Sequence, residues 1–441
     1  MNSNLSLPAT RITQLANGMH LVIAERPGLP LVAVRLELAS GTAHDPHSKP
    51  GLAEFAAQLL RRGTKTRTAD QIDEAIERVG GSLGIDVDSD STALAASLPS
   101  EHLPVALQIL ADLAQQPKFA ASEVAAAKAR TLAGLANDLD DPSSVADKAI
   151  SHFSLGAHPY AHPGSGFSRS VKTFTRADVV EHHARAFGPD CAAMYVVGDL
   201  DGADVEALVQ KRFGKWTRAA PPFEETPEVT GPSERQVIVV DKSDATQTQI
   251  RVASSGIPRN SPQYFDCMLA AGVLGGGFTS RLMEEIRVNR GLSYGVSSRF
   301  YSMRRGGEFA ISTFTKNETV IEALQVSLET ARALAAQGPT AEEMKRTQTY
   351  VNGLFPLQLE TNEQLARMLA DLRLYGIGDD YVSSFRDRVS AVTADKVKAA
   401  AQAHFPLEAY TIVCVGPAKH LKRALEPFGD TVKVRKLAEL S

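Results

Sequence analysis

The chain has 441 residues, of which 43% are hydrophobic and 22% are charged, and its formal net charge is −4 at pH 7. This is the composition of a globular protein of about two to four domains, and its weak negative charge gives no reason to expect nucleic-acid or membrane binding. The three cysteines, Cys191, Cys267 and Cys414, are far apart and odd in number, which favours buried free thiols over disulfide bonds.

The N-terminal sequence lacks the apolar core of a signal peptide, and no apolar run in the chain is long enough for a transmembrane helix. We therefore expect a soluble protein, cytoplasmic as the chain stands, or periplasmic if a signal has been removed. Residues 21–25 (LVIAE) and 31–40 (LVAVRLELAS) alternate like strands, which predicts strands near the beginning of the chain.

The next element, Ser48–Thr64 (SKPGLAEFAAQLLRRGT), is predicted to be a helix, with Pro50 in its first turn and Gly63 at its end. Its apolar residues recur at helical spacing and form one buried stripe. Further helical patterns follow at residues 69–81 and 122–139.

The histidines offer no convincing metal site. Those of HPYAH (residues 158–162) are four apart, but prolines prevent a regular helix there, so we expect a loop. His182 and His183 are adjacent and must point to different sides of a helix. His44 and His47 lie in a polar turn.

The chain is predicted to consist of two related halves. A proline-rich linker, Ala219–Glu234, divides it near its middle. Similar segments begin at Thr175 and Thr393, and similar strands end at Gly198 and Gly416, both pairs 218 positions apart. Further matches at an offset of 215 are Phe213 with Phe428 and Ser40–Gly41 with Ser255–Gly256.

These matches predict an α+β fold made of two homologous halves of roughly 210 residues. Each half would be a mostly antiparallel sheet packed with helices. The expected boundaries are residues 1–218 for the first half, 219–234 for the linker and 235–441 for the second half.

The second half contains one distinctive segment, Leu269–Val296. Its pattern predicts an apolar helix ending at Gly275–Gly277, a helix from about Thr279 through Arg287, a stop at Gly291 and a strand from about Leu292. The glycine run follows a helix and lacks a P-loop pattern, which argues against a phosphate site.

Arg287 and Tyr294 are the candidate functional residues of this segment. The helix end and the strand start are joined by a short turn, so both side chains can face one cleft. Two structural readings stay open: Arg287 can favour the helix C-terminal dipole, and Tyr294 can be a core residue. Arg281 and Arg290 are nearby alternatives to Arg287.

The predicted helix at 48–64 resembles the inverted zinc motif, H-x-x-E-H, of the pitrilysin/insulinase-type metallopeptidases. In that motif two histidines bind zinc and a glutamate activates water. At the matching positions this chain has Glu54, Ala57 and Gln58. The stretch matching the family's third ligand, Thr131–Ala136 (TLAGLA), has no acid and no histidine. The resemblance therefore implies a degenerate site that binds no zinc.

The segment around Arg287 and Tyr294 resembles the arginine/tyrosine signature of the same family, in which the two residues are also seven positions apart. The likeness covers nearly the whole chain, including the turn Asp140–Pro142 and the duplicated halves. It is greatest to the short-chain branch that includes mitochondrial processing peptidase and bacterial two-subunit enzymes. In that branch one subunit carries zinc and the other a degenerate motif.

The resemblance implies the non-zinc-binding subunit of a heteromeric endopeptidase. Arg287 and Tyr294 would bind substrate and stabilise the oxyanion, while a homologous partner with an intact H-x-x-E-H motif would supply zinc and the general base. This chain alone would be inactive, and its substrates would be unfolded peptides. The alternative is a non-catalytic scaffold or peptide-binding protein of the same fold. No serine or cysteine catalytic signature suggests a zinc-free enzyme.

Overall fold

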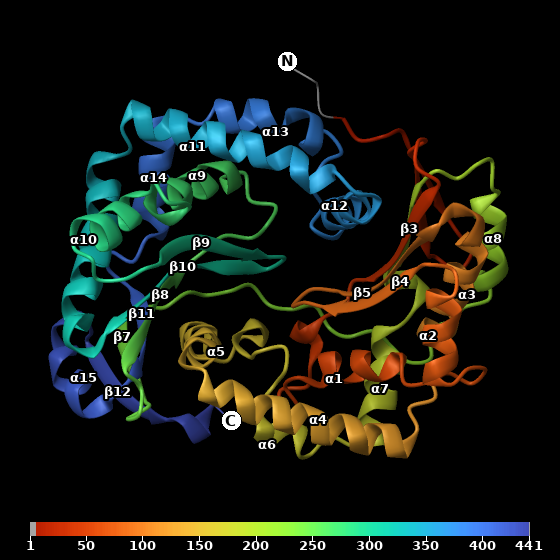
Figure 1. Cartoon of the computed structure of the whole chain (residues 1–441), viewed down its shortest axis with the longest axis horizontal. Coiled ribbons are helices and arrows are strands. Elements are labelled where there is room, and N and C mark those ends of the chain that lie inside the picture. Colours follow the sequence, from red (N-terminus) through yellow and green to blue (C-terminus); the bar gives the residue numbers. More distant parts are fainter. Residues whose placement is uncertain (1–5, 441) are drawn as a thin grey trace. The chain divides into compact units, whose positions relative to one another are not determined.

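The computed structural model describes residues 6–440, which form two compact α+β units, each built on a six-stranded sheet (Figure 1). The predicted fold class is confirmed. The first unit comprises the segment ending at Ala133, Gly164–Thr226 and Leu354–Ser383. The second unit comprises Gly134–Pro163, Pro227–Gly353 and the segment from Ser384 onward.

The sheet of the first unit has the strand order β1-β2-β6-β3-β5-β4. Its strands are antiparallel to their neighbours except for the parallel pair β2 and β6. The strands are β1 (Thr10–Gln14), β2 (His20–Glu25), β3 (Leu31–Leu38), β4 (Ser82–Val87), β5 (Thr92–Pro99) and β6 (Ala192–Gly198).

The sheet of the second unit has the order β12-β7-β11-β8-β10-β9, so five of its six strands repeat the first sheet in position and direction. β7 and β11 form the parallel pair that corresponds to β2 and β6, and β12 adds a second parallel neighbour to β7. The strands are β7 (Arg235–Asp241), β8 (Gln247–Ser255), β9 (Val296–Met303), β10 (Gly306–Lys316), β11 (Tyr410–Gly416) and β12 (Thr431–Lys436).

Matched residues of the two halves occupy matched places. Thr175 and Thr393 both cap helices, accepting a hydrogen bond from the backbone N–H three residues later, and the helices they begin, α7 and α14, each have 11 residues. Gly198 and Gly416 end the central strands β6 and β11. The internal repeat read from the sequence is thus a repeat of topology.

Helices cover both faces of each sheet. Those of the first unit are α1 (Leu52–Leu60), α2 (Ala69–Glu77), α3 (Leu103–Gln115), α6 (Ser168–Val171), α7 (Arg176–Ala186), α8 (Val205–Phe213) and α12 (Asn362–Leu374). Those of the second are α5 (Pro142–Leu155), α9 (Tyr264–Gly275), α10 (Val320–Gln337), α14 (Ala394–His404) and α15 (Ala418–Ala424). α4 (Ala121–Asp140), α11 (Ala341–Leu354) and α13 (Tyr381–Ser390) run across the unit boundaries.

The two halves of the sequence exchange one helix each. α12, from the second half, packs Leu365, Ala366, Leu369 and Ala370 on the sheet of the first unit. α5, from the first half, packs on β7, β8 and β11 of the second unit (Figure 1). The compact units therefore differ from the contiguous domains 1–218 and 235–441, because each sheet buries one apolar face under a helix from the other half.

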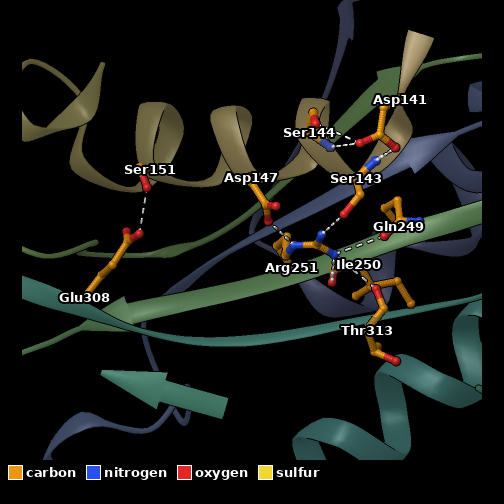
Figure 2. Close-up of polar contacts among 10 residues, drawn as sticks. All are labelled: Asp141, Ser143, Ser144, Asp147, Ser151, Gln249, Ile250, Arg251, Glu308 and Thr313. Atoms are coloured by element: carbon orange, nitrogen blue, oxygen red, sulfur yellow. Dashed lines mark hydrogen bonds and ion pairs between the residues drawn. The ribbon is translucent and has the colours of Figure 1, made fainter. Parts of the chain in front are cut away.

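Polar contacts fix α5 on the second sheet (Figure 2). The guanidinium of Arg251, on β8, donates to Asp147 Oδ1 at 2.6 Å and to Ser143 Oγ at 2.9 Å. It also donates to the backbone oxygens of Ile250 and Thr313. Glu308 on β10 is buried and accepts hydrogen bonds from two serines of α5, at 2.7 and 2.6 Å. Burial raises the pKa of the Glu308 carboxyl.

All three cysteines are free thiols; Cys267 and Cys414 are fully buried and Cys191 is half-buried. Between residues 6 and 440, no helix combines the length and the apolar character that crossing a bilayer requires.

Candidate functional site

The helix at the degenerate zinc motif is shorter than the sequence suggested. α1 begins at Leu52 and ends at Leu60, whereas 48–64 was expected, and Pro50 precedes the helix. The carboxylate of Asp45 accepts from the backbone N–H of Gly51 at 2.6 Å and of Ala53 at 2.7 Å. An acid six residues upstream thus caps the helix, which local sequence rules do not anticipate.

The three motif positions lie on α1, and their surroundings do not fit a zinc site. Ala57 is buried, Glu54 is half-buried and Gln58 is exposed. The Gln58 amide nitrogen donates to Glu54 Oε1 at 3.4 Å. The other carboxylate oxygen of Glu54 lies against Gly164, where a Cβ would be 2.8 Å away. A lone carboxylate beside an amide and a methyl group does not fit the ligands and base that a zinc peptidase requires.

The stretch expected at the third ligand position, Thr131–Ala136, lies within α4 and presents no side chain that binds zinc. Across residues 6–440, no three histidine, cysteine, aspartate or glutamate side chains gather as a metal site would need. The residues present in this chain therefore do not fit zinc. That the isolated chain binds none stays a prediction.

The other candidate histidines make contacts within the protein. His158 accepts from the backbone N–H of Tyr160 at 3.0 Å and caps a short 3₁₀ turn, so HPYAH is not a regular helix, as expected. The His182 ring lies 5.3 Å from that of Phe223, whereas His183 contacts the backbone oxygen of Ala114. Burial lowers the pKa of His182 to about 3 and of His183 to about 4, which keeps both neutral at pH 7.

The segment that holds Arg287 departs from the predicted α-helix. After one α-helical step at Arg281 and Leu282, residues Met283–Asn289 form a π-helix, which is a rare structure that occurs frequently at functional sites. Arg287 lies in its last turn and is exposed. The backbone N–H of Leu292 closes the helix by donating to the Ile286 oxygen at 2.8 Å. The 3.6-residue pattern used for sequence reading does not detect so short a π-helix.

Tyr294 lies in the connection before β9, because the strand begins at Val296 and not near Leu292. Two buried threonines of β10 hold this connection in place by hydrogen bonds. Thr315 donates to the Leu292 oxygen at 2.6 Å and Thr313 to the Gly295 oxygen at 2.9 Å. The Tyr294 side chain is 82% exposed, so the reading of Tyr294 as a core residue is wrong. An ordered backbone thus presents a solvent-facing phenol.

The three candidate arginines have different surroundings. Arg281 binds both carboxylate oxygens of Glu343, at 2.6 and 2.8 Å, and the Gly338 oxygen. Arg290 pairs with Glu285. Arg287 has no carboxylate partner among the described residues, and its guanidinium lies 5.4 Å from the ring centre of Phe278, which is 77% exposed. Arg281 and Arg290 are therefore committed to structural contacts, and Arg287 is available to a ligand.

The Arg281–Glu343 pair should make stability depend on acid. Hydrogen bonds from Arg281 and Thr340 lower the pKa of Glu343 to about 2. A lowered carboxyl pKa stabilises the fold above the unfolded-state pKa of about 4.5, and this contribution is lost as pH falls toward 2. We expect Glu343→Gln to lower the free energy of unfolding at pH 7 by about 2 kcal/mol. Urea unfolding at pH 7, 5, 4 and 3 should show the difference shrinking below pH 4.5.

The neighbouring, exposed Glu342 offers the matched control. Glu342→Gln should change the free energy of unfolding at pH 7 by less than about 0.5 kcal/mol. A Glu343→Gln difference that is the same at pH 3 and pH 7 would contradict the assignment of this carboxylate as a paired anion.

Two repeated α+β units, one with a degenerate motif helix and the other with an exposed arginine and tyrosine, define a protein of peptidase fold. Residues 21–157 match the family model described as insulinase (peptidase family M16), and residues 173–351 match the one described as peptidase M16 inactive domain. The chain belongs to the M16 (pitrilysin/insulinase) family of peptidases. The resemblance inferred from the sequence is confirmed.

Curated relatives and solved structures agree over nearly the full length. An uncharacterized zinc protease of Mycobacterium tuberculosis is 27% identical over 93% of both chains. One from Bacillus subtilis is 23% identical over 92% of this chain and 98% of its own. The crystal structure of a peptidase M16 inactive domain from Pseudomonas fluorescens has a TM-score of 0.87 and 26% identity, covering 93% of this chain and 98% of its own. A Helicobacter pylori protease, 19% identical, has a TM-score of 0.86 and covers 93% and 100%.

Proposed function

We propose that this chain is the non-zinc-binding subunit of a two-chain zinc endopeptidase and contributes Arg287 and Tyr294 to the substrate site. The observation that carries the proposal is the state of these two side chains. Both are exposed, and among the described residues neither has a carboxylate or hydrogen-bonding partner that would explain it as structural. The relatives named as zinc proteases support a role in proteolysis.

Arg287 and Tyr294 would both act as hydrogen-bond donors to oxygen atoms of the substrate. The Tyr294 hydroxyl would donate a hydrogen bond to the oxyanion that forms when a peptide carbonyl is attacked. The Arg287 guanidinium, with several donors in one plane, would bind a substrate carbonyl. The threonine contacts under the connection before β9 support this role, because a donor that is already positioned loses little energy to reorganisation.

Zinc, activated water and the general base would come from a homologous partner with an intact H-x-x-E-H motif. The reason lies in α1, where Glu54, Ala57 and Gln58 replace both ligands and the base. The alternative is a non-catalytic peptide-binding or scaffold protein of the same fold. The match of residues 173–351 to an inactive-type domain is compatible with either function.

The proposal is tested by preparing this chain alone, the zinc-binding homologue alone and the two co-expressed. Zinc content by atomic absorption and cleavage of an unstructured fluorogenic peptide are measured for each. We expect stoichiometric zinc and cleavage in the mixed complex, and neither in this chain alone. Cleavage by the isolated chain, or a mixed complex whose zinc-binding subunit is no more active than when alone, would refute it.

A further inference from the structure

A pocket of about 470 Å³ belongs entirely to the second unit, and Phe278, whose ring lies near the Arg287 guanidinium, lines it. It lies between α9, α11 and the edge strand β9, whose positions Figure 1 shows. Its volume is within the range of small-ligand sites. The walls are largely apolar and aromatic, formed by Tyr264, Met268, Val273, Phe300, Tyr350 and Val351.

The mouth of this pocket exposes apolar side chains without an evident structural reason. Phe278 is 77% exposed and Tyr350 is 54% exposed, and both line the pocket. Gly277 also lines it, and a Cβ built at Gly277 meets no atom within 4 Å. Aromatic side chains held in water around a concave apolar site are typical of a surface that binds a partner.

The charged side chains that line the pocket itself are all positive. No aspartate or glutamate lines it, whereas Arg299 and Arg346 do. Arg346 donates to the Thr279 backbone oxygen, and Arg299 lies near the ring of Tyr301. With Arg287 beside Phe278, the described residues place three arginines around the pocket, and none of the three has a carboxylate partner there. This arrangement is complementary to acidic groups in a ligand.

The neighbouring backbone can hold an extended chain. β9 pairs only with β10 among the described strands and forms one edge of its sheet. Ser298, Arg299 and Phe300 of β9 line the pocket directly. A peptide that adds to such an edge places alternate side chains on one face, where a pocket can select among them.

We propose that this pocket binds a bulky apolar side chain of a peptide, with acidic residues next to it contacting Arg299 and Arg346. The inference rests on the proposed function and adds to it a substrate class, namely unfolded peptides with an aromatic residue between acids. The pocket supplies the apolar contact and the three arginines supply the charge preference. Gly277 contributes no side chain to the lining.

The test uses the full chain and fluorescein-labelled peptides in an anisotropy titration. The probe has one phenylalanine flanked by glutamates, and the matched probes have glycine for the phenylalanine or lysines for the glutamates. We expect the glycine probe to bind roughly tenfold or more weakly, from the lost apolar burial. The lysine probe should also bind more weakly, with a difference that decreases at high salt.

The variants Gly277→Ala and Gly277→Leu add side-chain volume to the lining of the pocket in two steps. They should weaken the phenylalanine probe progressively and leave the glycine probe unchanged. Arg346→Gln should weaken the glutamate probe by about two- to fivefold. The control Arg423→Gln replaces an exposed arginine on α15, at the opposite edge of the same sheet, and should have no effect. Thermal unfolding verifies that each variant is folded.

Equal binding of the phenylalanine probe to the wild-type chain and to a folded Gly277→Leu variant would overturn the inference, as would tighter binding of the lysine probe. The binding assay needs neither zinc nor a partner, so it is independent of the proposed catalytic role. If the binding test fails and Tyr294→Phe still reduces cleavage in the mixed complex, only the pocket proposal is rejected. If the binding test succeeds and Tyr294→Phe has no effect on cleavage, only the oxyanion role of Tyr294 is rejected.

Discussion

Replacing Tyr294 by phenylalanine is expected to lower kcat of the proposed two-chain peptidase about a hundredfold, because loss of one oxyanion donor typically costs 10²–10³ in rate. The side chain is 82% exposed, so removing its hydroxyl should not destabilise the fold. The donor acts mainly in the transition state, so KM should change little and kcat/KM should fall with kcat. Steady-state cleavage of a fluorogenic peptide by the mixed complex measures both constants.

Tyr301 provides the matched control for this substitution. It lies on β9 in the same unit and is 44% exposed, and Tyr301→Phe removes the same hydroxyl outside the connection before the strand. Its kcat should remain within about twofold of the wild-type value. If Tyr294→Phe behaves like Tyr301→Phe, the phenol of Tyr294 is not an oxyanion donor.

Substitution of Arg251 should have the largest effect on stability. Its side chain is 6% exposed and donates to α5 and to two backbone oxygens. Arg251→Met keeps much of the apolar volume but leaves the Ile250 and Thr313 oxygens without this donor, at a cost of about 3 kcal/mol in unfolding free energy. Urea unfolding gives the magnitude, and hydrogen exchange should show faster exchange of the α5 amides.

Two comparisons separate this role from general effects of losing charge. The Asp147 side chain is 63% exposed, so water can replace it, and Asp147→Ala should cost less than Arg251→Met. Arg235→Met removes an exposed pair with Asp430 on the same sheet and should hardly change the urea midpoint. Equal stability losses for Arg251→Met and Arg235→Met would contradict the importance of the buried contacts.

Much of the architecture was predictable because duplicated sequence signals mark it. Thr175 and Thr393 are N-caps, whose chemistry is local, and Gly198 and Gly416 end equivalent strands. The degenerate motif was also readable, since it depends only on which side chains occupy α1. That Tyr294 is a surface residue and not a core residue needed the structure, which shows its exposure.

Other features depend on contacts distant in sequence or on unusual local geometry. The start of α1 is set by Asp45, outside the expected helix. The π-helix at Met283–Asn289 has no recognisable pattern over seven residues. The exposure of Phe278 was not predicted, although its position directly after a glycine run was a sequence signal for it. The exchange of α5 and α12 between the two halves could not be predicted from the sequence, because an apolar helix face does not specify which sheet it covers.

That reciprocal exchange makes the two halves mutually dependent. A chain severed between residues 219 and 234 would yield two fragments, each retaining a sheet but lacking the helix that shields one of its faces. Alanine, valine and tyrosine side chains of the first sheet, and isoleucine, valine and alanine side chains of the second, would then meet water. Neither fragment holds a complete hydrophobic core. We therefore expect the chain to fold as one cooperative unit, although its sequence is a tandem repeat.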